Sequence, residues 1–258
     1  MKFVLVGAGN VATHVGPRLL DCGHEVCTVF SRTADSAERL AVRLGARPVT
    51  SLGELPSDCN VCLVMLTDSV LPELAPQIVR SCGPDTIYLH TAGSVPVNVW
   101  KDAGALSYGV LYPMVSFSRD GSVEWSSVPL FVEASDSRTM SAVRALAGQL
   151  SPQVMELDSA GRKSLHLAAV FANNFSNRMY AVSQMLLQEQ GVPFSVMLPL
   201  IREAVRKLEG MQPSDAQTGP AVRGDRKVVQ EHMEMLSGHP EWRELYRLIS
   251  IDINNNLK

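Results

Sequence analysis

The chain has 258 residues, of which 46% are hydrophobic and 19% are charged, and its formal net charge is −3. This composition is typical of a globular protein with one large or two modest domains, and it excludes a bulk electrostatic attraction to nucleic acid or to an anionic membrane. No apolar stretch reaches the roughly 18 residues of a membrane span, and the N-terminus lacks the apolar core of a signal peptide. We therefore expect that the protein binds neither nucleic acid nor a membrane and that it is cytoplasmic.

Short apolar strands alternate with helices in the first part of the chain. A first strand at 2–9 runs into a glycine turn, and further strands are predicted at 24–32, 46–51, 58–68, 85–93, 107–114, 128–135 and 153–158. Helices are predicted between them at 10–23, 33–45, 71–83 and 136–150. The alternation predicts a parallel sheet covered by helices on both faces, in a domain spanning 1–157.

The pattern becomes almost entirely helical after Asp158. Helices are predicted at about 159–190, 193–210, 225–237 and 239–255, with segments rich in Gly and Pro between them. The fold class is therefore an α/β Rossmann-type parallel sheet followed by an all-α C-terminal domain at 158–258. Because the boundary is short, we expect the two domains to pack together with a cleft between them.

A glycine-rich turn follows the first strand and opens the first helix. It contains Gly7, Gly9 and Ala12 in the spacing G-x-G-x-x-A. Gly7 permits the tight turn, Gly9 lets a pyrophosphate approach the backbone, and Ala12 keeps the helix close to the strand. Asn10 and Val11 stand at the helix N-terminus, where free N–H groups bind phosphate. The motif predicts a dinucleotide site; the alternative is a glycine turn that binds nothing.

The end of the second strand indicates which dinucleotide is bound. An NAD site usually has Asp or Glu there, to accept hydrogen bonds from the ribose hydroxyls. This chain has Ser31 and Arg32 instead. A hydroxyl and a guanidinium suit a 2′-phosphate, so we predict NADP (NADPH) as the cofactor. The alternative is a surface arginine that caps the next helix.

Polar residues follow the fourth and fifth predicted strands, where ligands bind in sheets of this kind. Thr67 and Asp68 end the fourth strand, and we predict that they contact the cofactor. Asp68 is alternatively the N-cap of the helix that begins near residue 70. His90 and Ser94 end the fifth strand and are predicted substrate contacts, although His90 is equally consistent with a core histidine.

The five cysteines do not indicate a disulfide framework, because their number is odd. Cys59 and Cys62 have the spacing of a redox or zinc motif, but no second Cys or His pair stands nearby. We interpret them as buried thiols, predict no metal site, and leave a redox role as the alternative. Reduced thiols agree with a cytoplasmic location.

The segment 163–177 places polar residues on an apolar helix. On a helical wheel Lys163, His166, Asn174 and Asn177 form one stripe, with Asn173 at its edge. Asn and His are unusual on a solvated face, so we predict that the stripe faces a cleft; the alternatives are solvent or hydrogen bonds between domains. Lys163 or His166 would then be the proton donor of a hydride transfer, and Asn174 would orient the substrate oxygen.

The segment 218–232 contains a second polar cluster. Asp225 is predicted to cap the helix that begins near residue 226. Arg223 stands in the preceding loop, and we predict that it binds a carboxylate or a phosphate of the substrate.

Six motifs occur together in one order: VGAGNVA, SR after the second strand, HTAGSVP, GVLYPMVSFS, HLAAVFANNF and TGPAVRGD. In this combination the whole chain resembles a bacterial family that joins a Rossmann-like NADP-binding domain to a helical domain of unknown function. Its first half is similar to pyrroline-5-carboxylate reductases, prephenate dehydrogenases and F420-dependent NADP reductases. Its second half is similar to the helical domains of 6-phosphogluconate and β-hydroxyacid dehydrogenases. The resemblance implies an NAD(P)-dependent protein that forms a homodimer through its helical domain.

Two positions depart from these relatives. In the β-hydroxyacid dehydrogenases a catalytic Lys is followed four residues later by Asn, whereas Lys163 is followed by Leu167. The family's His-Pro after the fifth strand is Tyr112-Pro113 here. A histidine role at that position therefore cannot be carried over.

We predict an NADP-dependent oxidoreductase that acts on a small anionic substrate, a keto/hydroxy or imine/amine compound, in the cleft between the domains. The alternative is a catalytically silent NADP-binding protein, either a redox sensor or a regulatory subunit, which the missing Lys–Asn pair favours. Nucleotide chemistry without a redox step is a third possibility.

Overall fold

The computed structural model describes residues 1–118 and 121–256. The chain divides into two compact units, Met1–Asn173 and Asn174–Lys258. The domain boundary predicted at residues 157 and 158 coincides with the start of helix α6, whose N-cap is Asp158. The division into domains 1–157 and 158–258 stays a prediction.

The N-terminal unit contains one mixed sheet. Its strands are β1 (Lys2–Val6), β2 (Glu25–Phe30), β3 (Arg47–Val49), β4 (Val61–Val64), β5 (Ile87–His90), β6 (Ser107–Pro113), β7 (Leu130–Ala134) and β8 (Val154–Glu156). Its α-helices are α1 (Asn10–Asp21), α2 (Ala34–Leu44), α3 (Leu71–Cys82), α4 (Val99–Asp102), α5 (Ser137–Leu150) and α6 (Ser159–Ala169). Two 3₁₀ turns, Leu52–Glu54 and Trp125–Ser127, complete it.

The strand order is β3-β2-β1-β4-β5-β6-β7-β8, and the direction of winding reverses between β1 and β4. Strands β1 to β6 are parallel, so the carboxyl ends of β1, β2, β4, β5 and β6 lie along one side of the sheet, here called the carboxyl edge. Ligands of doubly wound sheets bind outside this edge, at the reversal. The predicted fold class, a Rossmann-type sheet followed by helices, is confirmed.

The sheet departs from the predicted parallel arrangement at β7, which pairs antiparallel with β6. The segment between them contains only the 3₁₀ turn Trp125–Ser127 among its described residues. A parallel connection needs a crossover of a dozen or more residues that is usually a helix. Helix α5 provides such a crossover between β7 and β8, and those two strands are parallel.

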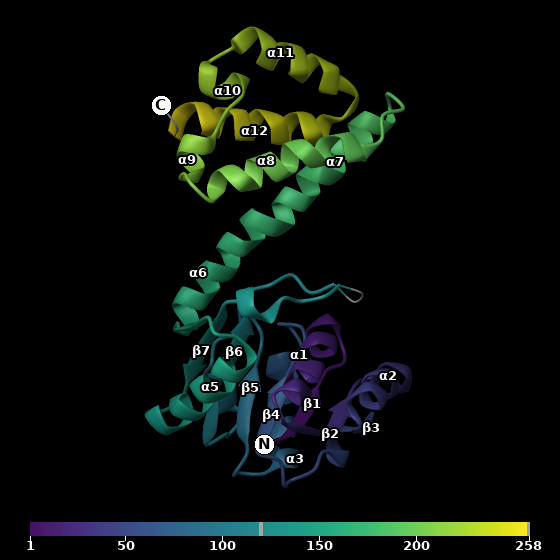
Figure 1. Ribbon diagram of the computed structural model, residues 1–258, viewed down its shortest axis with the longest axis vertical. Coiled ribbons are helices and arrows are strands. Elements are labelled where there is room, and N and C mark those ends of the chain that lie inside the picture. Colours follow the sequence, from purple (N-terminus) through teal and green to yellow (C-terminus); the bar gives the residue numbers. More distant parts are fainter. Residues whose placement is uncertain (119–120, 257–258) are drawn as a thin grey trace. The chain divides into compact units, whose positions relative to one another are not determined.

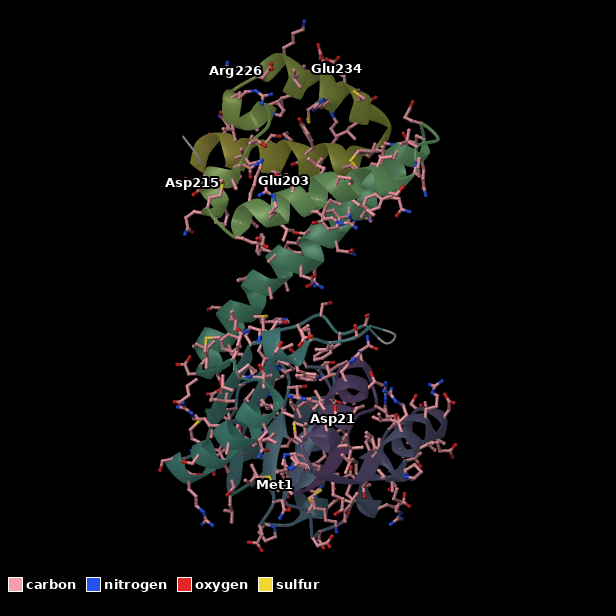
Figure 2. All side chains as sticks on the ribbon, in the orientation of Figure 1. Met1, Asp21, Glu203, Asp215, Arg226 and Glu234 are labelled. Carbon is pink, nitrogen blue, oxygen red and sulfur yellow. The ribbon has the colours of Figure 1, made fainter. Side chains whose placement is uncertain are left out.

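The two faces of the sheet bury different residues because successive side chains point to opposite sides. Phe3 and Leu5 of β1 pack with apolar residues of α1, α2 and α5, whereas Val4 and Val6 pack with α3 and α4. Figure 1 shows these helices around the sheet, and Figure 2 shows the side chains between them. Two apolar layers therefore hold the central strands rigidly, and the loops at the carboxyl edge are built on that support.

The second unit is helical. Its elements are α7 (Ser176–Gln188), a 3₁₀ turn (Phe194–Met197), α8 (Leu198–Leu208), α9 (Pro213–Ala216), α10 (Pro220–Arg223), α11 (Arg226–Met235), a 3₁₀ turn (Leu236–Gly238) and α12 (Pro240–Asn256). Helix α12 lies beside α10 and α11 (Figure 1). Asp225 caps α11 by accepting a hydrogen bond from the Val228 N–H at 3.3 Å, so the capping prediction is confirmed.

The long helix predicted at 159–190 is not a uniform α-helix. A π-helical turn, Val170–Phe175, separates α6 from α7. Residues in a π-turn bond to the fifth residue along the chain, so the turn is wider and the constant rotation assumed in the helical wheel does not hold there. Lys163 and His166 lie before the turn, and Asn177 lies after it, so the helical wheel does not establish the stripe predicted for 163–177, which stays a prediction.

Candidate functional site

The glycine turn after β1 has the backbone that its sequence requires. Gly7 has φ of 115°, a value that L-residues rarely adopt, and a Cβ there would overlap the carbonyl oxygen of Met65. At Gly9 a Cβ would meet no protein atom within 4 Å, so the surface beside this backbone is open. Ala12 is fully buried against the sheet. The turn is therefore closely packed at Gly7 and open at Gly9, as a phosphate site requires.

A pocket of about 280 Å³ lies over this turn. It is lined by residues that follow three neighbouring strands: Gly7, Ala8, Gly9, Phe30, Ser31, Arg32, Thr33, Ser36, Met65, Leu66, Thr67 and Val70. The pocket thus lies at the reversal of strand order. It brings together five of the predicted cofactor residues: Gly7, Gly9, Ser31, Arg32 and Thr67.

Arg32 is exposed at this pocket. It forms no ion pair with any residue of the described ranges, and the N-cap of α2 is Thr33, without a side-chain hydrogen bond. The alternative of an arginine that caps α2 is therefore not what the structure shows. Arg32 thus offers a guanidinium, unpaired among the described residues, next to the open glycine turn, and such a group suits the 2′-phosphate of NADP.

The other predicted cofactor residues have different surroundings. The Asn10 amide donates to the Phe117 carbonyl at 3.1 Å, so its side chain is engaged by the loop after β6. Val11 is partly buried and packs against the core. Both remain proposed cofactor contacts through the backbone at the start of α1.

Asp68 links two loops of the carboxyl edge. Its carboxylate accepts hydrogen bonds from the Ser94 N–H at 3.3 Å and from the Ser94 hydroxyl. Helix α3 begins at Leu71 and has Val70 at its N-cap position, so the capping alternative for Asp68 is wrong. The loops after β4 and β5 are held together by this pair.

His90 lies in the core and not at the surface of the site. Its side chain is fully buried, its Nδ1 accepts from the Ala92 N–H at 3.2 Å, and its ring lies near Trp100. Burial, reinforced by the positive charge of Arg162, lowers the pKa of His90 to about 3. The prediction that His90 contacts substrate is therefore corrected: it is a neutral core histidine.

His166 lies at the carboxyl edge beside β5 and β6. Its Nδ1 is 3.1 Å from the Tyr112 hydroxyl, and the two rings are edge to face at 6.2 Å between centroids. A Cβ at Gly93 would lie 2.5 Å from His166 Nδ1, so the ring packs directly on the glycine backbone. Sequence reasoning missed Tyr112; its place at the end of a strand beside Pro113 was the available signal.

Helix α6 is attached to the sheet by a buried ion pair. Arg162 is 1% exposed and pairs with Glu133 of β7. Its guanidinium also donates to the Val95 carbonyl at 2.5 Å, and Ser159 donates to Glu133 at 2.8 Å. The network joins α6 to β7 and to the loop after β5, and thereby positions His166. The sequence contains these residues, but nothing in their spacing indicates the pair.

Lys163 and Asn174 are exposed. Lys163 lies on α6 and forms no ion pair within the described part of the chain, whereas Asn174 is the first residue of the second unit. The predicted contact of Asn174 with the substrate oxygen stays a prediction.

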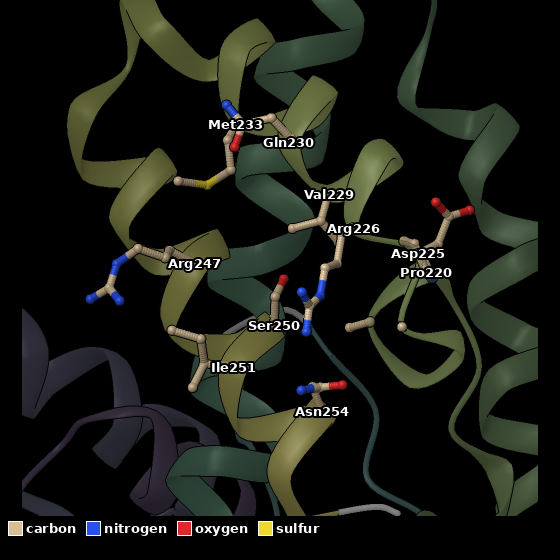
Figure 3. Close-up of a pocket in the computed structure, with 12 residues that line it drawn as sticks. Pro220, Asp225, Arg226, Val229, Gln230, Met233, Arg247, Ser250, Ile251 and Asn254 are labelled. Carbon is tan, nitrogen blue, oxygen red and sulfur yellow. The ribbon is translucent and has the colours of Figure 1, made fainter.

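Arg223 is an exposed residue at the end of α10. A pocket of about 450 Å³ lies next to α10, α11 and α12 and is lined by the neighbouring Arg226, Ser250 and Asn254. Figure 3 shows the Arg226 side chain pointing toward Ser250 and Asn254. Arg223 does not line this pocket.

The cysteines are free thiols. Cys59, Cys62 and Cys82 are buried. Interaction with Cys82 and burial raise the pKa of Cys59 far above its ordinary value. For Cys82, interaction with Cys59 lowers the pKa, but interaction with Cys62 and burial outweigh it, so that the pKa is also raised. Such thiols stay protonated and are poor nucleophiles. No group of His, Cys, Asp and Glu among the described residues could hold a metal ion, and none of the helices described is long and apolar enough to cross a membrane.

Two family models match the chain. That of the coenzyme F420-dependent NADP oxidoreductases matches residues 2–90, and that of the domain of unknown function DUF2520 matches residues 128–253. No curated protein matches the chain in sequence.

Solved structures resemble the chain over most or all of its length. BF3122 from Bacteroides fragilis, to which NADP oxidoreductase activity is ascribed, is 42% identical with a TM-score of 0.94, over 99% of this chain and 98% of that one. An imine reductase from Myxococcus stipitatus in complex with NADP⁺ is 16% identical with a TM-score of 0.62, over 98% and 92%. A reductive aminase from Aspergillus terreus in complex with NADPH and ethyl-5-oxohexanoate is 21% identical with a TM-score of 0.62, over 81% and 74%. At these low identities, the imine reductase and the reductive aminase show a similar fold and nothing about the activity of this chain.

Proposed function

The chain belongs to the family of NADP oxidoreductases in which a nucleotide-binding segment precedes DUF2520, and we propose that it transfers a hydride between NADP and a small anionic substrate. The reacting group of the substrate is a carbonyl or an imine in one direction, and a hydroxyl or an amine in the other. The observation that supports this proposal is the carboxyl edge itself. The pocket with Gly9 and Arg32 follows strands β1, β2 and β4 there, and His166 of α6 contacts Tyr112 at the end of β6.

The residues divide into a cofactor group and a reaction group. Gly7, Gly9, Asn10, Val11 and Ala12 hold the pyrophosphate at the start of α1. Ser31 and Arg32 hold the 2′-phosphate, and Thr67 and Asp68 border the nicotinamide. NADPH supplies the hydride when it is bound.

His166 is the proposed proton donor. An imidazole can both give and take the proton that accompanies hydride transfer. Lys163 is exposed, whereas a lysine that takes part in proton transfer is usually desolvated. We therefore place Lys163 and Arg223 as contacts to the negative charge of the substrate, Asn174 as a contact to its oxygen, and Ser94 as a further contact. A substrate site between the two domains, and a cytoplasmic location, stay predictions.

We propose that the protein is a homodimer through its helical domain. Among the described residues of 174–258 only Leu236 is buried. Helix α8 carries exposed Leu198, Val205 and Leu208, which with the partly buried Ile201 form one apolar face at helical spacing. Because a monomer would leave this face in water, a second copy of the chain is its proposed cover.

A catalytically silent NADP sensor is the second candidate. It is favoured by Leu167, which stands where the β-hydroxyacid dehydrogenases have the Asn of their Lys–Asn pair.

The experiment that separates the two follows the consumption of NADPH with a panel of 2-keto acids and cyclic imines. We expect turnover with at least one anionic member and none with His166→Ala, which should still bind NADPH. Tight NADPH binding without consumption on any compound would support the sensor, and failure to bind NADPH would contradict both functions.

A further inference from the structure

Two side-chain pairs lie at the carboxyl edge of the N-terminal unit: Asp68 with Ser94, and Tyr112 with His166. The function proposed above uses only His166 as an acid, and gives Tyr112 no role. Yet the side chain of Tyr112 is in direct contact with that histidine.

The His166 ring is held on several sides. Tyr112 contacts Nδ1, and the ring lies on Gly93, where a Cβ would come within 2.7 Å of the ring carbon Cγ. The helix that carries the ring is anchored one turn earlier by the buried pair of Arg162 and Glu133. The ring therefore has little freedom to turn over and exchange the positions of its two nitrogens.

The two nitrogens of His166 have different surroundings. Nδ1 is occupied by Tyr112. Nε2 forms no hydrogen bond with a residue of the described ranges and is not among the fully buried polar atoms that lack a partner. Nε2 is thus the nitrogen that a substrate can reach.

The phenol of Tyr112 stays neutral. Its side chain is 9% exposed, and burial, with the negative charge of Asp68 as a further cause, raises the pKa of Tyr112 above its ordinary value. A neutral phenol can donate its O–H to Nδ1 of a neutral imidazole, and can accept from Nδ1–H of an imidazolium. In both states the remaining ring proton is on Nε2.

We propose that Tyr112 is a positioning residue that occupies Nδ1 of His166 and so makes Nε2–H the group that hydrogen bonds to the substrate and protonates it. The inference rests on the proposed function for its catalytic consequence, but not for its geometry. In the reductive direction the hydride adds to the carbonyl or imine carbon, the Nε2–H bond of the imidazolium breaks, and an O–H or N–H bond forms on the product. The imidazole that remains carries its proton on Nδ1, from which the Tyr112 hydroxyl accepts a hydrogen bond, until Nε2 takes up a proton from the solvent.

The test is the tautomer of His166, measured by ¹⁵N NMR of the full-length protein labelled at its histidines, at a pH where the ring is neutral. The His166 signals are identified by their loss in His166→Gln. We expect Nδ1 to be entirely unprotonated and Nε2 entirely protonated in the wild type, and Tyr112→Phe to show the mixture of two tautomers found for imidazole in water. Tyr108→Phe, on the same strand without a contact to His166, should match the wild type.

A mixture of tautomers in the wild type, or a proton on Nδ1, would overturn the inference. So would an unchanged His166 spectrum in Tyr112→Phe. Because no substrate is needed, this result is independent of whether the protein turns over NADPH.

Kinetics separate positioning from simple structural support. With an active substrate, Tyr112→Phe should lower kcat by about 10- to 100-fold, a part of the roughly 100- to 10,000-fold that general acid catalysis contributes, and leave the KM for NADPH within about twofold. An equal loss in kcat and in NADPH affinity would indicate general damage to the fold and contradict a positioning role.

Discussion

Two glycines of the first turn, Gly7 and Gly9, are required for different reasons, although they are two residues apart. Gly7→Ala places a Cβ on the Met65 carbonyl at a φ of 115°, whereas Gly9→Ala places one in open space. We expect Gly7→Ala to lower the free energy of unfolding by about 1–3 kcal/mol, from strain and overpacking.

Gly9→Ala should fold with almost unchanged stability but bind NADPH at least about tenfold more weakly, because its methyl group occupies the phosphate position. Denaturant unfolding and calorimetric titration with NADPH measure the two quantities. Equal stability losses in both variants would contradict this distinction.

Arg32 determines the choice between NADPH and NADH in this account. A charge-assisted hydrogen bond contributes roughly 1.5–3 kcal/mol, so Arg32→Ala should weaken NADPH binding by about 10- to 100-fold and leave NADH binding nearly unchanged. Arg80→Ala, another exposed arginine, on α3, is the matched control. If NADPH and NADH affinities fell together, the 2′-phosphate contact would be disproved.

Residues whose role depends on local backbone were predictable from the sequence. The glycine turn and the Asp225 cap belong to this group, because their signals lie within a few residues. The sequence could not decide between a buried and a substrate-facing His90, and it did not indicate the contact of Tyr112 with His166, since both depend on segments that are far apart in the chain.

At the scale of elements, Asp136 caps the N-terminus of helix α5. Its carboxylate accepts from the N–H groups of Arg138 and Thr139, both at 2.9 Å. Hydrogen bonds from Thr139 and then Ser135 lower the pKa of Asp136 to about 2. A carboxylate with a lowered folded pKa stabilises the fold above its unfolded pKa, and the contribution is lost as pH falls toward the folded value.

Asp136→Asn should therefore unfold at a lower temperature than the wild type near neutral pH, and the difference should shrink as pH falls below about 4. Circular dichroism melts at several pH values measure this difference. Ser137→Ala, at the next position, should show no such dependence. A gap that stays constant with pH would show that the charge of Asp136 does not stabilise α5.

The sheet and most helices were predictable because their apolar periodicities differ. The antiparallel strand β7 was not, since its apolar residues resemble those of its parallel neighbours. It is distinguished by the lack of a crossover helix among the described residues between β6 and β7. The π-helical turn at Val170–Phe175 was also missed, because a helical wheel assumes the same rotation at every residue. That turn contains Asn173 and Asn174, two of the polar residues that attracted attention in the sequence.

At the scale of the whole molecule, the exposed apolar face of α8 predicts a dimer. Light scattering of the purified protein should give twice the mass of the chain. Val205→Glu should shift it toward monomer, because a charge would be buried in the interface. Val42→Glu, which changes an 83% exposed residue on α2, should leave the dimer intact. A wild-type monomer at micromolar concentration would contradict the proposal.

The central claim is that hydride moves between NADPH and a small substrate on this protein. The most direct measurement uses NADPH carrying deuterium at the transferred position, a panel of 2-keto acids and cyclic imines, and mass spectrometry of the products. The account predicts that one anionic compound gains a single deuterium at its reduced carbon, in step with the formation of NADP⁺, and that His166→Ala abolishes the transfer. NADPH that binds but transfers deuterium to no compound would contradict it.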